Sequence, residues 1–259
     1  MESTTPTLGK GSRCFAIIFV LGTSPLDRPI YSVFSNQILG APGAGKGTLC
    51  AHLAQIHNLT HYSVGDNLRS WMHKNRGTSL AAQIQDKLDN QGFLSSEDLN
   101  PFLCQAIMEA IYQDEPKPKG ILVDGFPRCL EQLESFSVWP FEDKLPLCPI
   151  SDSEVRPNAK PDIVLSLEVT KQNARARYIS RARDSNDSKE KFERRFVEYE
   201  AETIAVKDVY HQRGILINVD TNGSKEENID KLTRKLDKSG LWQKVIVEGS
   251  TGVHILTKA

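Results

Sequence analysis

The chain has 259 residues, which is enough for one α/β domain with a large core or for two small domains. Its composition, 39 % apolar and 25 % charged, is ordinary for a soluble globular protein, and a net charge of −1 gives no support to a nucleic-acid or membrane partner. The five cysteines are odd in number, widely spaced and without a C-x-x-C pair, so they indicate neither a zinc site nor a disulfide framework. We therefore expect a reducing compartment, the cytoplasm, with the nucleus as a second compatible location.

The first apolar segment predicts the centre of a sheet. Residues 1–14 are expected to be disordered, and the apolar run at 15–21 is typical of a parallel strand buried on both faces. Residues 23–40 carry two prolines and scattered polar residues, and they separate this strand from the glycine-rich stretch that follows. A Leu-Gly dipeptide occurs at 21–22 and again at 39–40, so removal of 23–40 leaves an uninterrupted strand and loop. We expect an insert that is either a retained short intron or gene-model error, or a genuine surface insertion.

Residues 40–48, Gly-Ala-Pro-Gly-Ala-Gly-Lys-Gly-Thr, are typical of a phosphate-binding loop. The glycines let the backbone turn sharply and direct consecutive N–H groups at one anion. Lys46 supplies a positive charge for the β- and γ-phosphates, Thr48 supplies a hydroxyl for Mg²⁺, and a helix at 46–57 presents its positive end to the same anion. The ATP-binding residues expected here are Gly43, Ala44, Gly45, Lys46, Gly47 and Thr48.

The rest of the chain alternates strand-like and helix-like segments, which predicts a parallel α/β sheet. The expected strands are 59–63, 121–124, 163–169 and 214–219. The expected helices are one opened by Gly65, then 80–91, one capped by Ser95 or Ser96, 128–139, 171–183, 189–213 and 225–236. The tail at 241–259 contains two strand-like patches, 245–247 and 253–256, which the pattern does not assign to the sheet.

A second motif, Asp124-Gly-Phe-Pro-Arg128, follows an apolar strand. An acid at that position can hold Mg²⁺ through water opposite the Thr48 hydroxyl, and Arg128 offers a planar fork suited to a phosphate. The alternative is an ordinary strand-to-turn junction with an exposed acid and an exposed arginine.

A third signal is a set of arginines, Arg177, Arg181, Arg183 and Arg195. Arg177 and Arg181 are four residues apart, so they share one face of a helix. A solvated charged face is the usual meaning of such a run. Phosphoryl transfer, however, needs several cations around the oxygens of the transferring group, and the other two motifs favour that interpretation.

Together these motifs resemble those of the nucleoside monophosphate (NMP) kinases, the adenylate kinase and UMP-CMP kinase family. The resemblance rests on the loop at 40–48, Ser63-Val-Gly-Asp-Asn-Leu-Arg69, the motif at 124–128 and Arg177-x-x-x-Arg181, in the family's order. It covers residues 15–236 apart from the insert. It implies a kinase domain at 15–240, with a P-loop parallel sheet flanked by helices, a helical NMP-binding arm at about 62–92 and a short lid at about 182–194.

The resemblance also implies roles for individual residues. Lys46 would steer the transferring phosphoryl group, and Arg69 and Arg128 would hold the NMP phosphate. Arg177 would meet the ATP phosphates or the adenine ring. The residues expected to close over the transfer path are Arg181, Arg183 and Arg195, with Arg194 as an alternative to Arg195.

The remaining implied roles concern the metal and the acceptor. Asp66 and Asp124 would position Mg²⁺ through waters, with Thr48 as its direct ligand. Ser63 and Gly125 would contact the NMP, and Gln132 matches the position that reads its base.

The resemblance implies phosphoryl transfer from ATP·Mg²⁺ to an NMP, which gives ADP and a nucleoside diphosphate. The acceptor stays open between AMP and UMP or CMP, and the latter would place the enzyme in pyrimidine biosynthesis. The alternatives are a P-loop ATPase of another purpose, or a nucleotide-binding product that the insert inactivates. ATP and an NMP are the expected partners, and we expect a monomer without nucleic-acid or membrane partners.

Overall fold

The computed structural model describes residues 12–23, 43–90, 94–137, 161–181, 189–249 and 253–256. The predicted insert, except for Thr23, lies outside the described residues, as do residues 182–188 of the predicted lid. Of the predicted phosphate-binding motif, residues 43–48 are described.

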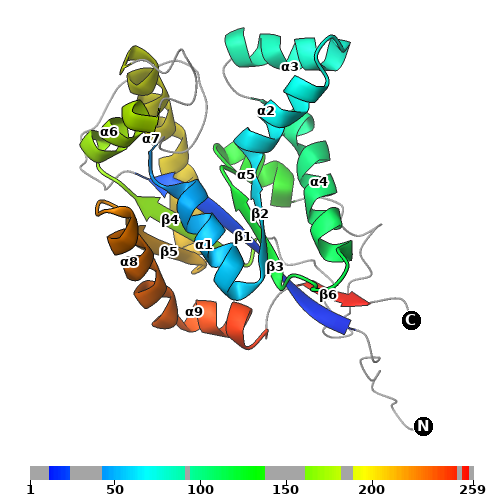
Figure 1. Cartoon of the computed structure of the whole chain (residues 1–259), viewed down its shortest axis with the longest axis vertical. Coiled ribbons are helices and arrows are strands. Elements are labelled where there is room, and N and C mark those ends of the chain that lie inside the picture. The colour runs from blue at the N-terminus through cyan, green and yellow to red at the C-terminus, as the bar shows by residue number, and fades with distance from the viewer. Residues whose placement is uncertain are drawn as a thin grey trace.

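Five parallel strands form the sheet, in the order β2-β3-β1-β4-β5, with helices on both faces (Figure 1). Their bounds are β1 Ser12–Thr23, β2 Leu59–Ser63, β3 Gly120–Asp124, β4 Ile163–Glu168 and β5 Leu216–Asp220. The predicted α/β class with a parallel sheet is thus confirmed, and each strand lies where the apolar pattern places it, within a few residues.

The central strand β1 sends alternate side chains to the two faces of the sheet. Phe15, Ile17, Phe19 and Leu21 belong to one buried cluster, and Ala16, Ile18 and Val20 belong to the other. All seven side chains are at most 3 % exposed, as expected for a strand that has helices on both sides. β1 also begins three residues earlier than expected, at Ser12, so the first fourteen residues are not all disordered.

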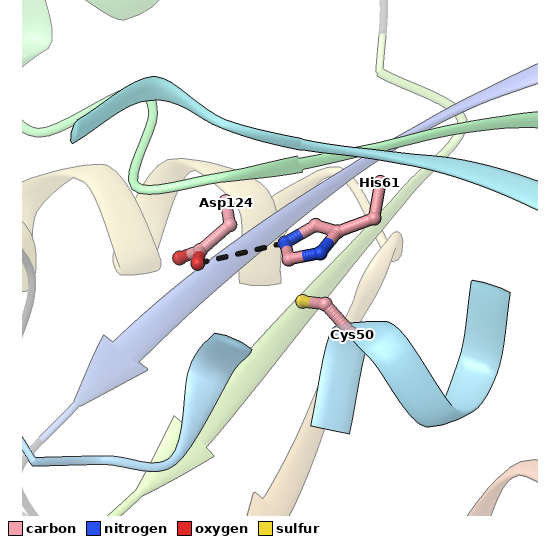
Figure 2. Close-up of side chains that lie close together, drawn as sticks. All are labelled: Cys50, His61 and Asp124. Carbon is pink, nitrogen blue, oxygen red and sulfur yellow. Dashed lines mark ion pairs between the residues drawn. The ribbon is translucent and has the colours of Figure 1, made fainter. Parts of the chain in front are cut away.

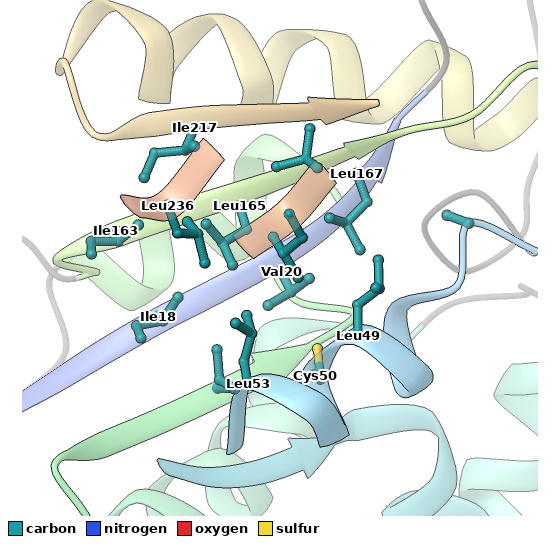
Figure 3. Close-up of a cluster of buried hydrophobic side chains, with 14 of the residues drawn as sticks. Ile18, Val20, Leu49, Cys50, Leu53, Ile163, Leu165, Leu167, Ile217 and Leu236 are labelled. Carbon is teal, nitrogen blue, oxygen red and sulfur yellow. The ribbon is translucent and has the colours of Figure 1, made fainter. Parts of the chain in front are cut away.

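Helices cover the sheet in two layers. The face of Ile18 and Val20 is covered by α1 Lys46–His57 and α8 Lys225–Asp237 (Figure 3), and residues of α6 Lys171–Arg181 belong to the same buried cluster. The face of Phe19 is covered by α4 Ser96–Tyr112 and α5 Leu130–Ser137, while α7 Lys189–Gln212 contributes to both clusters. Among the described helices, none combines the length and the apolar character that a membrane crossing requires.

Two further helices, α2 Val64–Lys74 and α3 Ser79–Asn90, project on one side of the carboxyl end of the sheet, opposite α6 (Figure 1). They occupy the segment expected to be the NMP-binding arm. A salt bridge from Lys87 to Asp98, at 2.6 Å, ties α3 to the first turn of α4. Burial alone would raise the pKa of Asp98, but hydrogen bonds from Lys87 and Ser95 lower it. Ser95 caps α4 as predicted, in a capping box with Asp98.

The carboxyl-terminal tail contains a helical turn and a strand. Residues 245–247, a strand-like patch that the sequence pattern leaves unassigned, lie in a π-helical turn, η1 Gln243–Val247, that continues α9 Gly240–Trp242. The reason is the spacing of Trp242, Val245 and Ile246, which share one helical face and are buried in the cluster of α1 and α8. β6 Val253–Leu256 is a strand as expected, and it pairs antiparallel with the start of β1.

The two-sided burial of β1 gives a stability prediction. Phe19 is fully buried and meets the rings of Phe126 and Phe136 edge-on, with centroids 5.3 and 4.9 Å away. Phe19→Ala should lower the free energy of unfolding by about 3–5 kcal/mol, measured by urea denaturation. The control is Val197→Ala on α7, where the side chain is 57 % exposed and the expected change is within about 0.5 kcal/mol. Similar losses in the two variants would contradict the prediction.

Candidate active site

The phosphate-binding loop closes against α6. Gly43 and Gly45 have φ values of +88° and +83°, a region that side chains rarely adopt. A Cβ on Gly43 would lie 2.2 Å from the carbonyl oxygen of Ala174, so the loop backbone touches the backbone of α6 directly. α1 begins at Lys46, directly after Gly45, and its positive end therefore faces the space that this loop surrounds.

Lys46 is the point on which charges from several elements converge. Its pKa is lowered, first by burial, while Asp124 at the end of β3 opposes that shift. The guanidinium groups of Arg128 and Arg181 lower the same pKa further. Residues from the end of β3, the turn after it and the end of α6 thus act on the ammonium group of Lys46 at the start of α1. The structure brings together four of the predicted site residues.

Asp124 occupies the carboxyl edge of the sheet, as its position after an apolar strand predicts. The parallel register places it beside Ser63 at the end of β2 and beside Val20 of β1. Gly125 follows with φ +86°, and its N–H donates to the carbonyl of Val20 at 3.3 Å. This turn holds the carboxylate at the edge of the core, where Asp124 is only 7 % exposed.

Gln132 fixes the backbone of Arg128 through a hydrogen bond. The Nε of Arg128 donates to the carbonyl of Gly125 at 2.8 Å, and its backbone N–H donates to the Gln132 Oε1 at 2.8 Å. Gln132 is fully buried, and its amide also donates to the carbonyl of Leu94 at 3.1 Å. A primary amide has two donors and two acceptor lone pairs, so these bonds leave part of its capacity for a ligand.

The arm begins with a local hydrogen-bonded group. The Ser63 hydroxyl caps α2 by accepting from the Asp66 N–H at 3.4 Å, and it donates to the Asp66 carboxylate at 3.1 Å. Arg69 donates to the other carboxylate oxygen of Asp66 at 2.5 Å. The side chains of Arg69 and Asp66 are 45 % and 49 % exposed, so this pair contributes less than about 1 kcal/mol to stability. Asp66 therefore orients Arg69, and breaking this weak pair when Arg69 binds a ligand costs little free energy.

Arg177 joins the phosphate-binding loop to the turn before α8. It donates to the carbonyl of Gly43 at 3.4 Å and to the carbonyl of Gly223 at 2.6 Å. Burial lowers its pKa, and Asp220 opposes that shift. The predicted ATP-binding arginine thus lies against the loop.

Asn228 is a residue that sequence reasoning missed. Its amide donates to the carbonyls of Thr221 and Gly223 at 3.1 and 3.0 Å, and its oxygen accepts from the Gly223 N–H at 2.9 Å. It therefore fixes the turn that receives Arg177. The signal was present in the sequence, because Asn228 lies on the same stripe of α8 as the buried Leu232 and Leu236, where an apolar residue is expected.

The structure describes only some of the remaining predicted site residues. Thr48 is exposed in the first turn of α1, and Arg181 lies at the end of α6 with its guanidinium 5.9 Å from the Tyr178 ring centroid. Arg183 lies outside the described residues. Arg194 and Arg195 lie within α7, but the described part of the chain does not include their side chains.

The contact between loop and α6 gives a second prediction. Gly43→Ala should lower the free energy of unfolding by at least about 1–3 kcal/mol, because the residue combines a positive φ with a backbone clash. Gly47→Ala is the matched control, since a Cβ there meets nothing within 4 Å and helix geometry favours alanine by up to about 1 kcal/mol. Urea denaturation of both variants checks this, and equal stability would mean that the loop does not rest on α6.

Comparison with known proteins agrees with this geometry. A sequence model of the adenylate kinase family matches residues 38–215. The chain is similar to an adenylate kinase of a Nitratiruptor species, 32 % identical over 192 residues, which are 73 % of this chain and 88 % of the relative. An adenylate kinase of Deinococcus radiodurans is 34 % identical over 194 residues, 75 % and 92 % of the two chains. Adenylate kinase isoenzyme 1 of Caenorhabditis elegans is 28 % identical over 209 residues, 77 % and 89 %. The chain therefore belongs to the adenylate kinase family, and it is a nucleoside monophosphate kinase that transfers a phosphoryl group from ATP to a nucleoside monophosphate.

Proposed function

We propose that AMP is the acceptor and that Lys46 marks the path of the transferred group. The action of Asp124, Arg128 and Arg181 on Lys46 carries the second part of this proposal, because phosphoryl transfer requires cations around the moving group. The relatives described above are adenylate kinases, which supports AMP over UMP or CMP.

The reaction needs no protein nucleophile. An oxygen of the NMP phosphate attacks the γ-phosphorus in line, and the protein supplies position, charge neutralisation and exclusion of water. Arg128 and Arg69 are the proposed contacts to the acceptor phosphate, and the support is that one follows β3 and the other lies on the arm. Arg181 is the proposed contact to the group in transit, and the support is that its charge acts on Lys46.

The donor atoms at this edge of the sheet fit Mg²⁺. Asp124 offers a carboxylate and Thr48 a hydroxyl, and hard oxygen donors are what Mg²⁺ prefers. Asp124 lies at the carboxyl edge of the sheet beside the ends of β1 and β2, and its charge acts on Lys46 at the start of α1. When bound, Mg²⁺ neutralises part of the phosphate charge. Thr48 is the proposed direct ligand, and Asp124 and Asp66 are the proposed partners of its waters.

The other predicted roles follow the positions of the residues. Arg177 contacts the carbonyl of Gly43, so it is the proposed contact to the ATP phosphates or adenine. Ser63 and Gly125 flank Asp124 at the carboxyl edge and are proposed contacts to the NMP. Gln132 is proposed to use its remaining hydrogen-bonding capacity on the acceptor base. Arg183, within the proposed lid at about 182–194, and Arg195 or Arg194 at the end of the lid are proposed to close over the transfer path. The proposed arm at about 62–92 and this lid belong to a kinase domain at 15–240.

We also propose that the insert leaves the loop functional. α1 packs on the Val20 face of the sheet through Leu49 and Leu53, even though residues 24–42 separate the described end of β1 from Gly43. The charge of Asp124 therefore acts on Lys46 in spite of the long connection. A monomer in the cytoplasm completes the proposal, and the support for the compartment is the scattered, unpaired pattern of the cysteines.

The acceptor can be identified by a coupled ADP-release assay with AMP, UMP, CMP and dCMP in turn. We expect AMP to give the highest kcat/KM, by at least about 10²-fold, because hydrogen-bonded base recognition discriminates strongly. A preference for UMP or CMP would instead identify a UMP-CMP kinase. ADP release without any monophosphate would contradict kinase action and favour an ATPase.

The same assay compares two arginine variants. Arg128→Ala should lower AMP-dependent turnover by about 10²–10³-fold while ATP binding persists, because a charged contact to the acceptor phosphate is lost. Arg213→Ala is the matched control, since Arg213 follows α7 at the opposite end of the sheet and lies over the Tyr210 ring. Unchanged turnover in Arg128→Ala would refute the assigned role.

Deletion of residues 23–40 tests the insert. We expect the shortened chain to keep its activity and to gain roughly 1–2 kcal/mol in the free energy of unfolding, because a shorter connection costs less closure entropy. Thermal unfolding and the AMP assay measure the two effects. Loss of folding or of turnover would show that the segment is part of the native structure.

A further inference from the structure

Three side chains that share no sequence motif meet beneath the phosphate-binding loop. Cys50 comes from α1, His61 from β2 and Asp124 from the end of β3, and all three point into one small space (Figure 2). The Cys50 sulfur, an imidazole nitrogen of His61 and a carboxylate oxygen of Asp124 all lie within 4.8 Å of one another. Cys50 is 1 % exposed and Asp124 is 7 % exposed, so water competes little for their donor atoms.

We propose that Cys50, His61 and Asp124 form a binding site for a thiophilic divalent cation, with Zn²⁺ as its representative. Zn²⁺ takes thiolate, imidazole and carboxylate ligands at about 2.3, 2.0 and 2.0 Å, and a tetrahedral arrangement at these lengths separates the nitrogen from the oxygen by about 3.3 Å and the sulfur from either by about 3.5 Å. The separation between His61 Nε2 and Asp124 Oδ2 is 3.7 Å. Small side-chain rotations therefore bring the three donors onto one ion and leave a fourth position for water.

The hydrogen bonding of His61 supports a ligand at this place. Its Nε2 is buried and has no hydrogen-bond partner, although the Asp124 carboxylate lies nearby at 3.7 Å. A buried nitrogen without a partner costs about 1–3 kcal/mol. A cation on Nε2 would remove that cost and would also fix the adjacent carboxylate.

Cys50 can hold the ion only as a thiolate, because the thiolate and not the thiol is the metal ligand. Metal binding replaces the thiol proton, which passes to solvent as the sulfur–metal bond forms. No oxidant and no second thiol are needed.

The site would regulate the enzyme, and this step rests on the proposed function. Asp124 acts on Lys46 and is the proposed partner of the Mg²⁺ waters, so it cannot serve a thiophilic ion at the same time. Occupancy of the site by Zn²⁺ should therefore inhibit phosphoryl transfer. Mg²⁺ should not compete effectively there, because it avoids thiolate ligands.

Binding is measured first, on the metal-free full chain without nucleotide. The probe is Zn²⁺ alone, in competition with a chromophoric chelator, and Co²⁺ is added in parallel to detect a thiolate-to-cobalt charge-transfer band. We expect one site whose Zn²⁺ affinity falls at least tenfold in Cys50→Ala and in His61→Gln, with loss of the cobalt band in Cys50→Ala. Cys104→Ser, at a half-buried thiol of α4, is the control and should bind as the unmodified chain does.

Two outcomes would overturn the site. One is equal Zn²⁺ affinity in the unmodified chain and both ligand variants. The other is a cobalt band that survives Cys50→Ala and disappears in Cys104→Ser. Far-UV circular dichroism establishes that each variant is folded, and two ligand variants on different elements guard against a folding defect in one of them.

Activity is measured second, with ATP, AMP and excess Mg²⁺. Cys50→Ala and His61→Gln should keep basal turnover and lose inhibition by Zn²⁺, whereas Cys104→Ser should stay sensitive. Zn²⁺ binding in a chain without kinase activity would leave the site standing and refute the proposed function. Kinase activity with no Zn²⁺ binding would refute the site alone.

Discussion

The two-sided burial of β1 is the constraint on which the rest of this structure depends. Because β1 sends Ile18 and Val20 to one face and Phe19 to the other, helices must cover both faces, and the flanking strands must run parallel to it. Parallel strands end at one edge, so the residues that follow them meet there. α1, seated on the Val20 face, directs its amino terminus to the same edge.

At that edge, groups of opposite charge act on Lys46. One carboxylate, that of Asp124, opposes the lysine's burial and two guanidinium groups. A ligand or competing cation that neutralised the Asp124 carboxylate would therefore change the pKa of the Lys46 ammonium directly. The same carboxylate borders Cys50 and His61, so the catalytic edge and the proposed cation site share one acidic group. A thiophilic ion and the ATP-bound metal would then exclude each other through a single side chain.

Two buried amides hold the working residues in place. Gln132 accepts from the backbone of Arg128 and donates to that of Leu94, and Asn228 fixes the turn that receives Arg177. Each amide bonds to backbone groups that regular secondary structure leaves unpaired, which is where a buried polar group is stabilising. The arm residues contrast with them, because the pair of Asp66 and Arg69 is exposed and weak. The buried amides make a rigid base for a site whose outer parts can rearrange.

The sequence by itself determined the order and type of the main elements and the family motifs, because both are local. Apolar runs, glycines at positive φ and the Ser95 cap act within a few residues. It left residues 245–247 unassigned, because a short apolar run suits a strand or a helix, and only the packing of Trp242, Val245 and Ile246 in the cluster of α1 and α8 decides for a helical turn. Only the tertiary structure decided that Cys50, His61 and Asp124 meet, since each lies on a different element and no spacing connects them. Strand register and helix packing, which act between distant parts of the chain, set that meeting.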